Sequence, residues 1–149
     1  MSRQPHIPLP QGDRLRYTPR HIPDGEHPTV LVVDDEASIV ELLAQVLDDA
    51  GYTVLTATDG WTGLTISRAI HPELVLTDYT MPELDGGRFV RELRRHRATR
   101  DIPVVLMSAL RPSKDELHGV PFLAKPFDLN DVVEIVAQHV DAPTSERSH

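Results

Sequence analysis

The chain has 149 residues, the length of one ordinary domain, and its 40% hydrophobic and 26% charged residues are typical of a folded globular protein. A formal net charge of −8 disfavours non-specific binding to nucleic acid or acidic membranes, and the absence of cysteine excludes disulfides and cysteine-based metal sites. No segment has the apolar length of a signal peptide or a membrane span, so we expect a cytoplasmic protein without a membrane partner.

The first 28 residues differ from the rest of the chain. Prolines at positions 5, 8, 10, 19, 23 and 28, with little apolar periodicity, predict a proline-rich irregular N-terminal arm over residues 1–28. A passive tail is the simpler interpretation; a docking peptide would be anchored by Leu15, Tyr17 and Ile22. Residues 141–149 are predicted to be a short polar C-terminal tail. One domain is therefore predicted over residues 29–140.

The first half of this domain alternates strand and helix patterns. Residues 29–33 are a continuous apolar run, typical of a strand covered on both faces. Apolar residues then recur at helical spacing over residues 39–47, and Gly51 fits the C-cap of that helix. Residues 52–56 predict a second strand, and Asp59 is suited to N-cap the helix that follows it.

The second half repeats the alternation. Strands are predicted at residues 74–77, 104–107 and 122–124. A helix opens at Gly86 or Gly87, and a last helix, capped by Asp128, carries apolar residues at helical spacing up to Val140. Five strands that alternate with helices predict βαβ units, right-handed crossovers and a parallel sheet.

Polar side chains follow four of the predicted strands. Asp34-Asp35-Glu36 follows the first strand, Asp78 the third, Ser108 the fourth and Lys125 the fifth. Ligands of open α/β sheets bind at the carboxyl ends of the strands, so these groups are expected to share one edge. Carboxylates, a hydroxyl and an ammonium together suit a phosphoryl group held on a divalent metal ion. Taken singly, each group has a simpler reading as a turn cap or a surface charge.

The motifs at these strand ends resemble the receiver domain of bacterial two-component response regulators. They occur in the order of that family, as Asp34-Asp35, Asp78, Met81-Pro82, Asp85-Gly86, Ser108-Ala109 and Lys125-Pro126-Phe127. The resemblance covers about residues 29–140. It implies an α/β, flavodoxin-like, doubly wound fold with a five-stranded parallel sheet in the order 2-1-3-4-5.

The resemblance also assigns roles to the carboxylates. It makes Asp78 the phosphoacceptor, a carboxylate nucleophile that forms an aspartyl phosphate. It implies a Mg²⁺ cofactor bound directly by Asp35, Asp78 and the backbone carbonyl of Thr80, with Asp34 acting through water. The simpler alternative is that one of the two adjacent aspartates caps the helix that begins near Ala37.

Three further residues receive roles in binding and switching. The resemblance implies that Lys125 binds a phosphoryl oxygen, that Ser108 is the switch residue, and that Phe122 is the aromatic partner that changes rotamer with it. The simpler readings are a surface lysine, a serine that terminates a strand, and a core aromatic. The family further implies a cis peptide bond before Pro126, an isomer found in only about 5% of X–Pro bonds generally.

The chain departs from the family pattern in one segment. Only sixteen residues separate Ser108 from Lys125, which implies a shortened fourth helix. The segment Arg111–His118 leaves room for about two helical turns, with Pro112 confined to the first. The surface through which this family usually contacts its downstream partners must therefore be altered.

A stripe of arginines lies on and after the third predicted helix, at Arg88, Arg91, Arg94, Arg95, Arg97 and Arg100. A solvated helix face is preferred over a nucleic-acid contact, because no aromatic residues are interleaved with it.

These observations predict a signalling protein in two-component signal transduction. We expect it to accept a phosphoryl group on Asp78 from a sensor histidine kinase or a histidine phosphotransfer protein, and to act on a downstream protein, since no output domain follows residue 140. Nucleic acid is not an expected partner, no oligomeric state is indicated, and the only catalysis expected is its own phosphoryl transfer and dephosphorylation. The main alternative is a phosphorylation-independent interaction module. A phosphohydrolase is disfavoured because Thr80 stands where the second carboxylate is usually needed.

Overall fold

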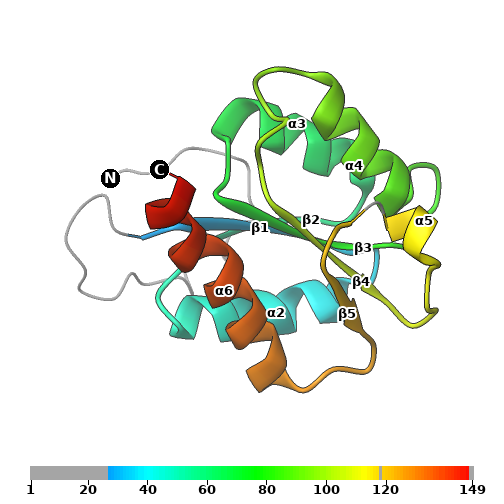
Figure 1. Ribbon diagram of the computed structural model, residues 1–149. Helices are drawn as coiled ribbons and strands as arrows, with labels where there is room; N and C mark the ends of the chain where they lie inside the picture. Colours follow the sequence, from blue (N-terminus) through cyan, green and yellow to red (C-terminus); the bar gives the residue numbers. More distant parts are fainter. Residues whose placement is uncertain (1–26, 118, 148–149) are drawn as a thin grey trace.

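The computed structural model describes residues 27–117 and 119–147, so most of the predicted N-terminal arm lies outside the described residues (Figure 1). Five parallel strands form one sheet in the order β2-β1-β3-β4-β5, which confirms the predicted fold and strand order. The strands are β1 (Thr29–Val33), β2 (Thr53–Ala57), β3 (Leu74–Asp78), β4 (Val104–Ser108) and β5 (Phe122–Ala124).

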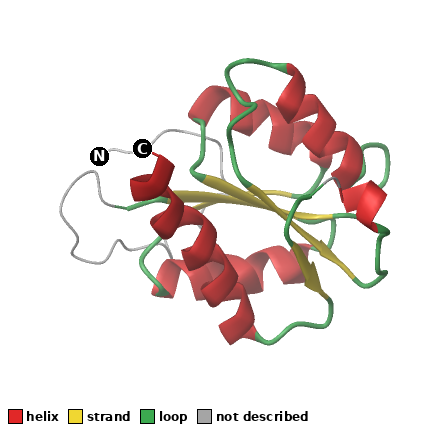
Figure 2. Cartoon of the chain, viewed as in Figure 1, coloured by secondary structure: helices red, strands yellow, loops and turns green. Residues whose placement is uncertain are grey.

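Helices cover both faces of this sheet. They are α2 (Ala37–Asp49), α3 (Gly60–Ile70), α4 (Gly86–Arg95), α5 (Lys114–Leu117) and α6 (Leu129–Arg147). Figures 1 and 2 show α2 and α6 on one face, with α3, α4 and α5 on the other. None of the helices in the described residues combines the length and hydropathy needed to cross a bilayer.

Two hydrophobic clusters hold the layers together. Val30 and Val32 of β1 pack with the cluster that includes α2 and α6, whereas Leu31 and Val33 pack with the cluster of α3 and α4. This alternation follows from the two-residue period of a strand, and burial on both faces explains why the strand sequence is continuously apolar. Phe89 of α4 is fully buried, a burial that contributes roughly 1.5–3 kcal/mol.

Local capping explains where several elements begin and end. The Asp59 carboxylate accepts from the Thr62 backbone N–H at 2.8 Å and caps α3 as predicted. Gly51, at φ 104°, follows the end of α2, where its N–H donates to Asp48 O and the next N–H, of Tyr52, donates to Leu47 O. These two bonds form a Schellman motif. Tyr52 therefore belongs to the helix terminus, and β2 begins one residue later than predicted.

The structure at the start of α2 contradicts the alternative that one of the two adjacent aspartates caps this helix. Its N-cap residue is Glu36, which makes no side-chain capping bond, so neither Asp34 nor Asp35 caps this helix. Asp34 instead accepts from the Glu36 N–H at 2.9 Å, just before the helix. Neither side chain caps α2, and both lie near Asp78 at the carboxyl edge of the sheet.

The shortened fourth helix is confirmed and is smaller than the sequence suggested. Helix α5 has four residues, about one turn, and Pro112 precedes it rather than occupying its first turn. The last helix extends beyond the apolar residues that predicted it. These end at Val140, whereas α6 continues to Arg147. The predicted boundary of the domain at residue 140 therefore falls within a helix.

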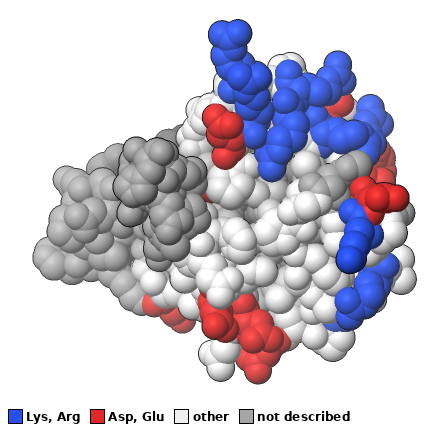
Figure 3. Space-filling model, viewed as in Figure 1, with Lys and Arg blue, Asp and Glu red and all other residues white. Residues whose placement is uncertain are grey.

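Basic side chains predominate on the surface near α4. Arg88, Arg91, Arg94 and Arg95 of α4 are all exposed. Figure 3 shows most of the visible Lys and Arg side chains on the side of α4 and α5, with some Asp and Glu among them, and further Asp and Glu on the opposite side, near α2 and α6. The arginine stripe is thus an exposed helix face, as predicted.

Candidate functional site

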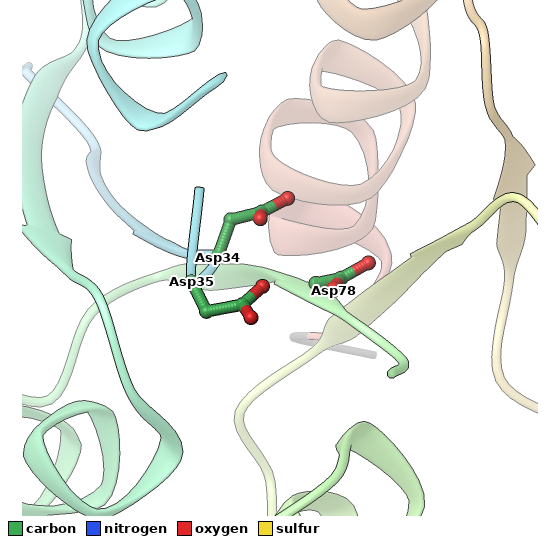
Figure 4. Close-up of side chains that lie close together, drawn as sticks. All are labelled: Asp34, Asp35 and Asp78. Atoms are coloured by element: carbon green, nitrogen blue, oxygen red, sulfur yellow. The ribbon is translucent and has the colours of Figure 1, made fainter. Parts of the chain in front are cut away.

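The carboxyl ends of four strands meet at one edge of the sheet. In the strand register Asp78 of β3 lies opposite Met107 of β4, and Ser108 lies opposite Ala124, the residue before Lys125. The first strand ends beside β3, which places Asp34 and Asp35 next to Asp78 (Figure 4). The structure therefore brings together the groups that the sequence placed at separate strand ends.

Three carboxylates form the centre of this edge. Asp34 is fully buried, Asp78 is 6% exposed and Asp35 is exposed. One oxygen from each lies within 4.8 Å of the others. Three negative charges at this separation repel one another, so the cluster is stable only with a proton or a cation nearby.

Lys125 supplies one such cation. Its Nζ lies 2.9 Å from Asp34 Oδ2 and 3.2 Å from Asp78 Oδ1, and Glu36 Oε1 is 4.0 Å away. The reading of Lys125 as an ordinary surface lysine is therefore wrong. The Lys125–Pro126 peptide bond is cis, the isomer that the family resemblance implied.

The crowding of charge changes the acidity of two groups. Burial, followed by the negative charge of Asp34, raises the pKa of Asp78 to about 6, although Lys125 opposes the change. Burial alone would lower the pKa of Lys125, but its hydrogen bonds and charge interactions with Asp34 and Asp78 outweigh burial and raise it. At neutral pH the site therefore holds an ammonium beside a mostly ionised Asp78.

The donor set fits a small hard cation. Three carboxylates and one ammonium leave two net negative charges, and carboxylate oxygens are the ligands that Mg²⁺ prefers. Asp35 is the exposed member of the three, so a hydrated ion could reach it. Thr80 lies in the exposed loop after β3, and its predicted role as a carbonyl ligand remains a prediction.

Ser108 and Phe122 lie beside this centre. Ser108 is 1% exposed, and its Oγ accepts from the Leu110 N–H at 3.0 Å, the turn bond that the simpler reading expected. Its carbonyl accepts from the Lys125 N–H at 2.8 Å, which ties the end of β4 to the lysine. Phe122, partly buried on β5, pairs with Leu106. The predicted switch roles of Ser108 and Phe122 remain predictions.

The loop after Asp78 is held by residues that the sequence analysis did not single out for this role. The Gly86 N–H donates to Tyr79 O at 2.7 Å. A Cβ on Gly86 would lie 2.7 Å from Tyr79 Cα and 2.8 Å from Asp78 O, so only glycine permits this approach. Leu84, fully buried, anchors the same loop against Gly60 of α3. The Asp85-Gly86 pair was the sequence signal, but a motif alone does not show which atoms are in contact.

Comparison with known proteins agrees with this geometry. Residues 30–137 match a family described as the response regulator receiver domain. The chain is 34% identical over 111 residues to the DNA-binding dual master transcriptional regulator RpaA of Synechocystis sp., a match that covers 71% of this chain and 46% of that protein. It is 35% identical over 127 residues to the probable transcriptional regulator ycf27 of Porphyridium aerugineum, covering 80% and 52%.

A solved structure extends the likeness to three dimensions. The Vibrio cholerae chemotaxis protein CheY4 superposes with a TM-score of 0.72 at 28% identity, covering 76% of this chain and 98% of that one. The chain spans about half the length of the curated regulators it matches. The likeness therefore concerns one domain of those regulators, and the DNA binding in the name of RpaA is not transferred to this chain.

Proposed function

The chain belongs to the response regulator receiver domain family, and on that premise we propose that it is a phosphoacceptor in two-component signalling, modified on Asp78. The observation that carries the proposal is the contact of Lys125 Nζ with both Asp34 and Asp78, within a cluster of three carboxylates at one sheet edge. The phosphoryl donor is a phosphohistidine on a sensor histidine kinase or a histidine phosphotransfer protein.

In the proposed reaction Asp78 acts as the nucleophile. An ionised carboxylate oxygen attacks phosphorus and forms an O–P bond while the N–P bond of the phosphohistidine breaks, and the imidazole leaves with the electron pair. With a pKa of about 6, Asp78 is mostly ionised at neutral pH. Lys125, 3.2 Å from Asp78, is positioned to pair with an oxygen of the phosphoryl group that arrives there.

A divalent cation would balance the remaining negative charge. Asp35, Asp78 and the Thr80 carbonyl would hold Mg²⁺, with Asp34 acting through water, and the ion would supply positive charge to the phosphoryl oxygens. The exposure of Asp35 and burial of Asp34 support this division of roles. Asp34 also positions Lys125, because its Oδ2 accepts a hydrogen bond from Lys125 Nζ at 2.9 Å.

Ser108 would respond to phosphorylation of Asp78 by forming a new hydrogen bond. A hydroxyl that accepts from the Leu110 N–H still has its own hydrogen to donate to a phosphoryl oxygen. A contact made only in the phosphorylated state biases a two-state equilibrium of the β4–α5 loop, with Phe122 adjusting on the neighbouring strand. The altered surface then changes binding of a downstream protein.

The test is covalent labelling with a small phosphodonor. Incubation with acetyl phosphate and Mg²⁺ should add one phosphoryl group to the wild type and none to Asp78→Asn. Asp101→Asn, which changes an exposed carboxylate outside the cluster, should be labelled like the wild type. An unmodified wild type, under conditions that label another receiver domain, would refute the proposal.

One observation favours a second function. Helix α5 has a single turn, so the surface that should report phosphorylation is reduced. A phosphorylation-independent interaction module on the same fold is the alternative. It predicts that wild type and Asp78→Asn bind the same partner with equal affinity, with or without beryllofluoride as a phosphoryl mimic.

A further inference from the structure

A groove lies beside α4. Helices α3, α4 and the α5 segment share one face of the sheet, where Leu117 and Val120 pack against the core cluster. The Val120 N–H donates to Leu117 O at 2.9 Å in the turn before β5, and a groove of about 870 Å³ lies between α4, the start of β4 and Gly119–Pro121. This volume is within the range of roughly 300–1,000 Å³ found for binding pockets. The groove is separate from the carboxylate cluster.

The wall of the groove is basic. Arg88, Arg91, Arg94 and Arg95 of α4 all line it, against one acidic residue, Glu92. Arg95 is paired with Glu92 at 3.3 Å, and Arg94 donates to the carbonyl of Ile102 at 2.9 Å. Arg91 is exposed and forms no ion pair within the described residues. Figure 3 shows a blue, basic surface on the side of α4. At least one guanidinium is thus available to an incoming anion.

The groove also has apolar lining residues. Val120, Pro103 and Pro121 are partly exposed there, whereas Val90 and Val104 line the groove but are buried. A basic wall beside partly exposed apolar residues complements a ligand that has carboxylates along one side and apolar side chains along the other. The groove therefore fits an amphipathic acidic segment better than a uniformly charged polymer.

Other occupants complement this surface less well. The chain's own residues 1–26 carry four arginines against three carboxylates, so they offer no excess of negative charge. A second copy could present its acidic side, but joining two different faces gives a head-to-tail contact that builds rings or filaments, whereas the two-fold dimer that is commonest among oligomers joins identical faces. Single-stranded nucleic acid binds best where aromatic faces are available for stacking, and Trp61, beside α4, already lies under the Arg88 guanidinium at 5.5 Å; the net charge of −8 disfavours binding to a duplex.

We propose that this groove binds an acidic, amphipathic segment of a partner protein. Carboxylates of the segment pair with the α4 arginines, above all with Arg91, while its apolar side chains contact Val120 and the neighbouring Pro103 and Pro121. The contact goes beyond phosphorylation at Asp78, because none of these groove residues belongs to the carboxylate cluster. Either proposal can therefore fail without the other.

The experiment uses the full chain and a synthetic probe. The probe is a fluorescein-labelled amphipathic peptide with Glu on one helical face and Leu on the other, and its affinity is measured by anisotropy. R88E/R91E changes two groove arginines, while R97E/R100E makes the same charge change at exposed arginines that do not line the groove. We expect about tenfold weaker binding for the first pair relative to the second, with both variants folded by circular dichroism.

Two further measurements complete the test. In NMR spectra of the wild type, the peptide should shift the amide signals of Val104, Gly119 and Val120, and a peptide with Gln in place of every Glu should bind more weakly. Equal loss of binding in both double variants, or shifts confined to other surfaces, would overturn the proposal. So would binding of single-stranded DNA that is tighter than that of the peptide and depends on Arg88 and Arg91.

Discussion

The Lys125 ammonium donates a hydrogen bond to the buried Asp34 carboxylate at 2.9 Å, across 91 positions of sequence. This contact joins the end of β1 to the chain after β5, the two strands on either side of β3 and β4. It holds the ammonium over the site at which Asp78 would accept a phosphoryl group. The same bond therefore serves stability and the proposed chemistry.

Removal of this ammonium should destabilise the fold. Lys125→Ala would leave Asp34, which is fully buried, without its ion-pair partner, at an expected cost of about 1–3 kcal/mol in metal-free buffer. Lys114→Ala removes the other lysine, which is exposed on α5, and should cost less than about 0.5 kcal/mol. Urea unfolding measures both. Equal stability of the two variants would show that the Asp34 contact contributes nothing.

Magnesium should stabilise the folded protein through the carboxylate cluster. An ion that binds only the folded state adds about 2.7 kcal/mol at a hundredfold excess over its Kd. Thermal unfolding should shift upward with MgCl₂ in the wild type and in Asp115→Asn, whose exposed carboxylate is outside the cluster. Asp35→Asn should lose most of the shift. A shift that survives this substitution would place the ion elsewhere.

The raised pKa of Asp78 predicts a pH dependence of stability. Burial and Asp34 raise this pKa from 3.8 to about 6, so the folded protein holds the proton more tightly than the unfolded chain. The stability this adds is complete below the unfolded value and is lost as the pH rises through about 6. Without metal, the wild type should lose on the order of 2 kcal/mol more than Asp78→Asn across that window. Parallel profiles of the two proteins would contradict the prediction.

Two adjacent glycines offer a matched test of the loop after Asp78. A Cβ on Gly86 would lie 2.7 Å from Tyr79 Cα, whereas a Cβ on Gly87 would meet nothing closer than 3.5 Å. Gly86→Ala should therefore push α4 from the loop, cost roughly 1–3 kcal/mol and slow labelling by acetyl phosphate. Gly87→Ala should be neutral, or stabilising by about 0.5–1 kcal/mol through helix propensity. Similar results for both glycines would refute the close-packing argument.

The pattern of residues was sufficient for much of the fold. Apolar runs and caps such as Asp59 and Gly51 depend on neighbours within a few positions, so their elements were predicted to within a residue or two. The family resemblance supplied the strand order, and it identified the residues now found together at the sheet edge. The short connection between Ser108 and Lys125 also predicted that the fourth helix would be reduced.

Tertiary contacts decided the rest. The sequence shows that Asp34, Asp78 and Lys125 end separate strands, but only the strand register sets the 2.9 and 3.2 Å separations that hold the ammonium between two carboxylates. The sequence predicts that the α4 arginines form an exposed stripe; in the fold they also line a groove, because α4 lies beside the start of β4 and Gly119–Pro121. Capping and periodicity are local properties and can be read from the chain. Burial, charge pairing and the shape of a groove depend on which distant segments pack together, and that is determined only in the folded molecule.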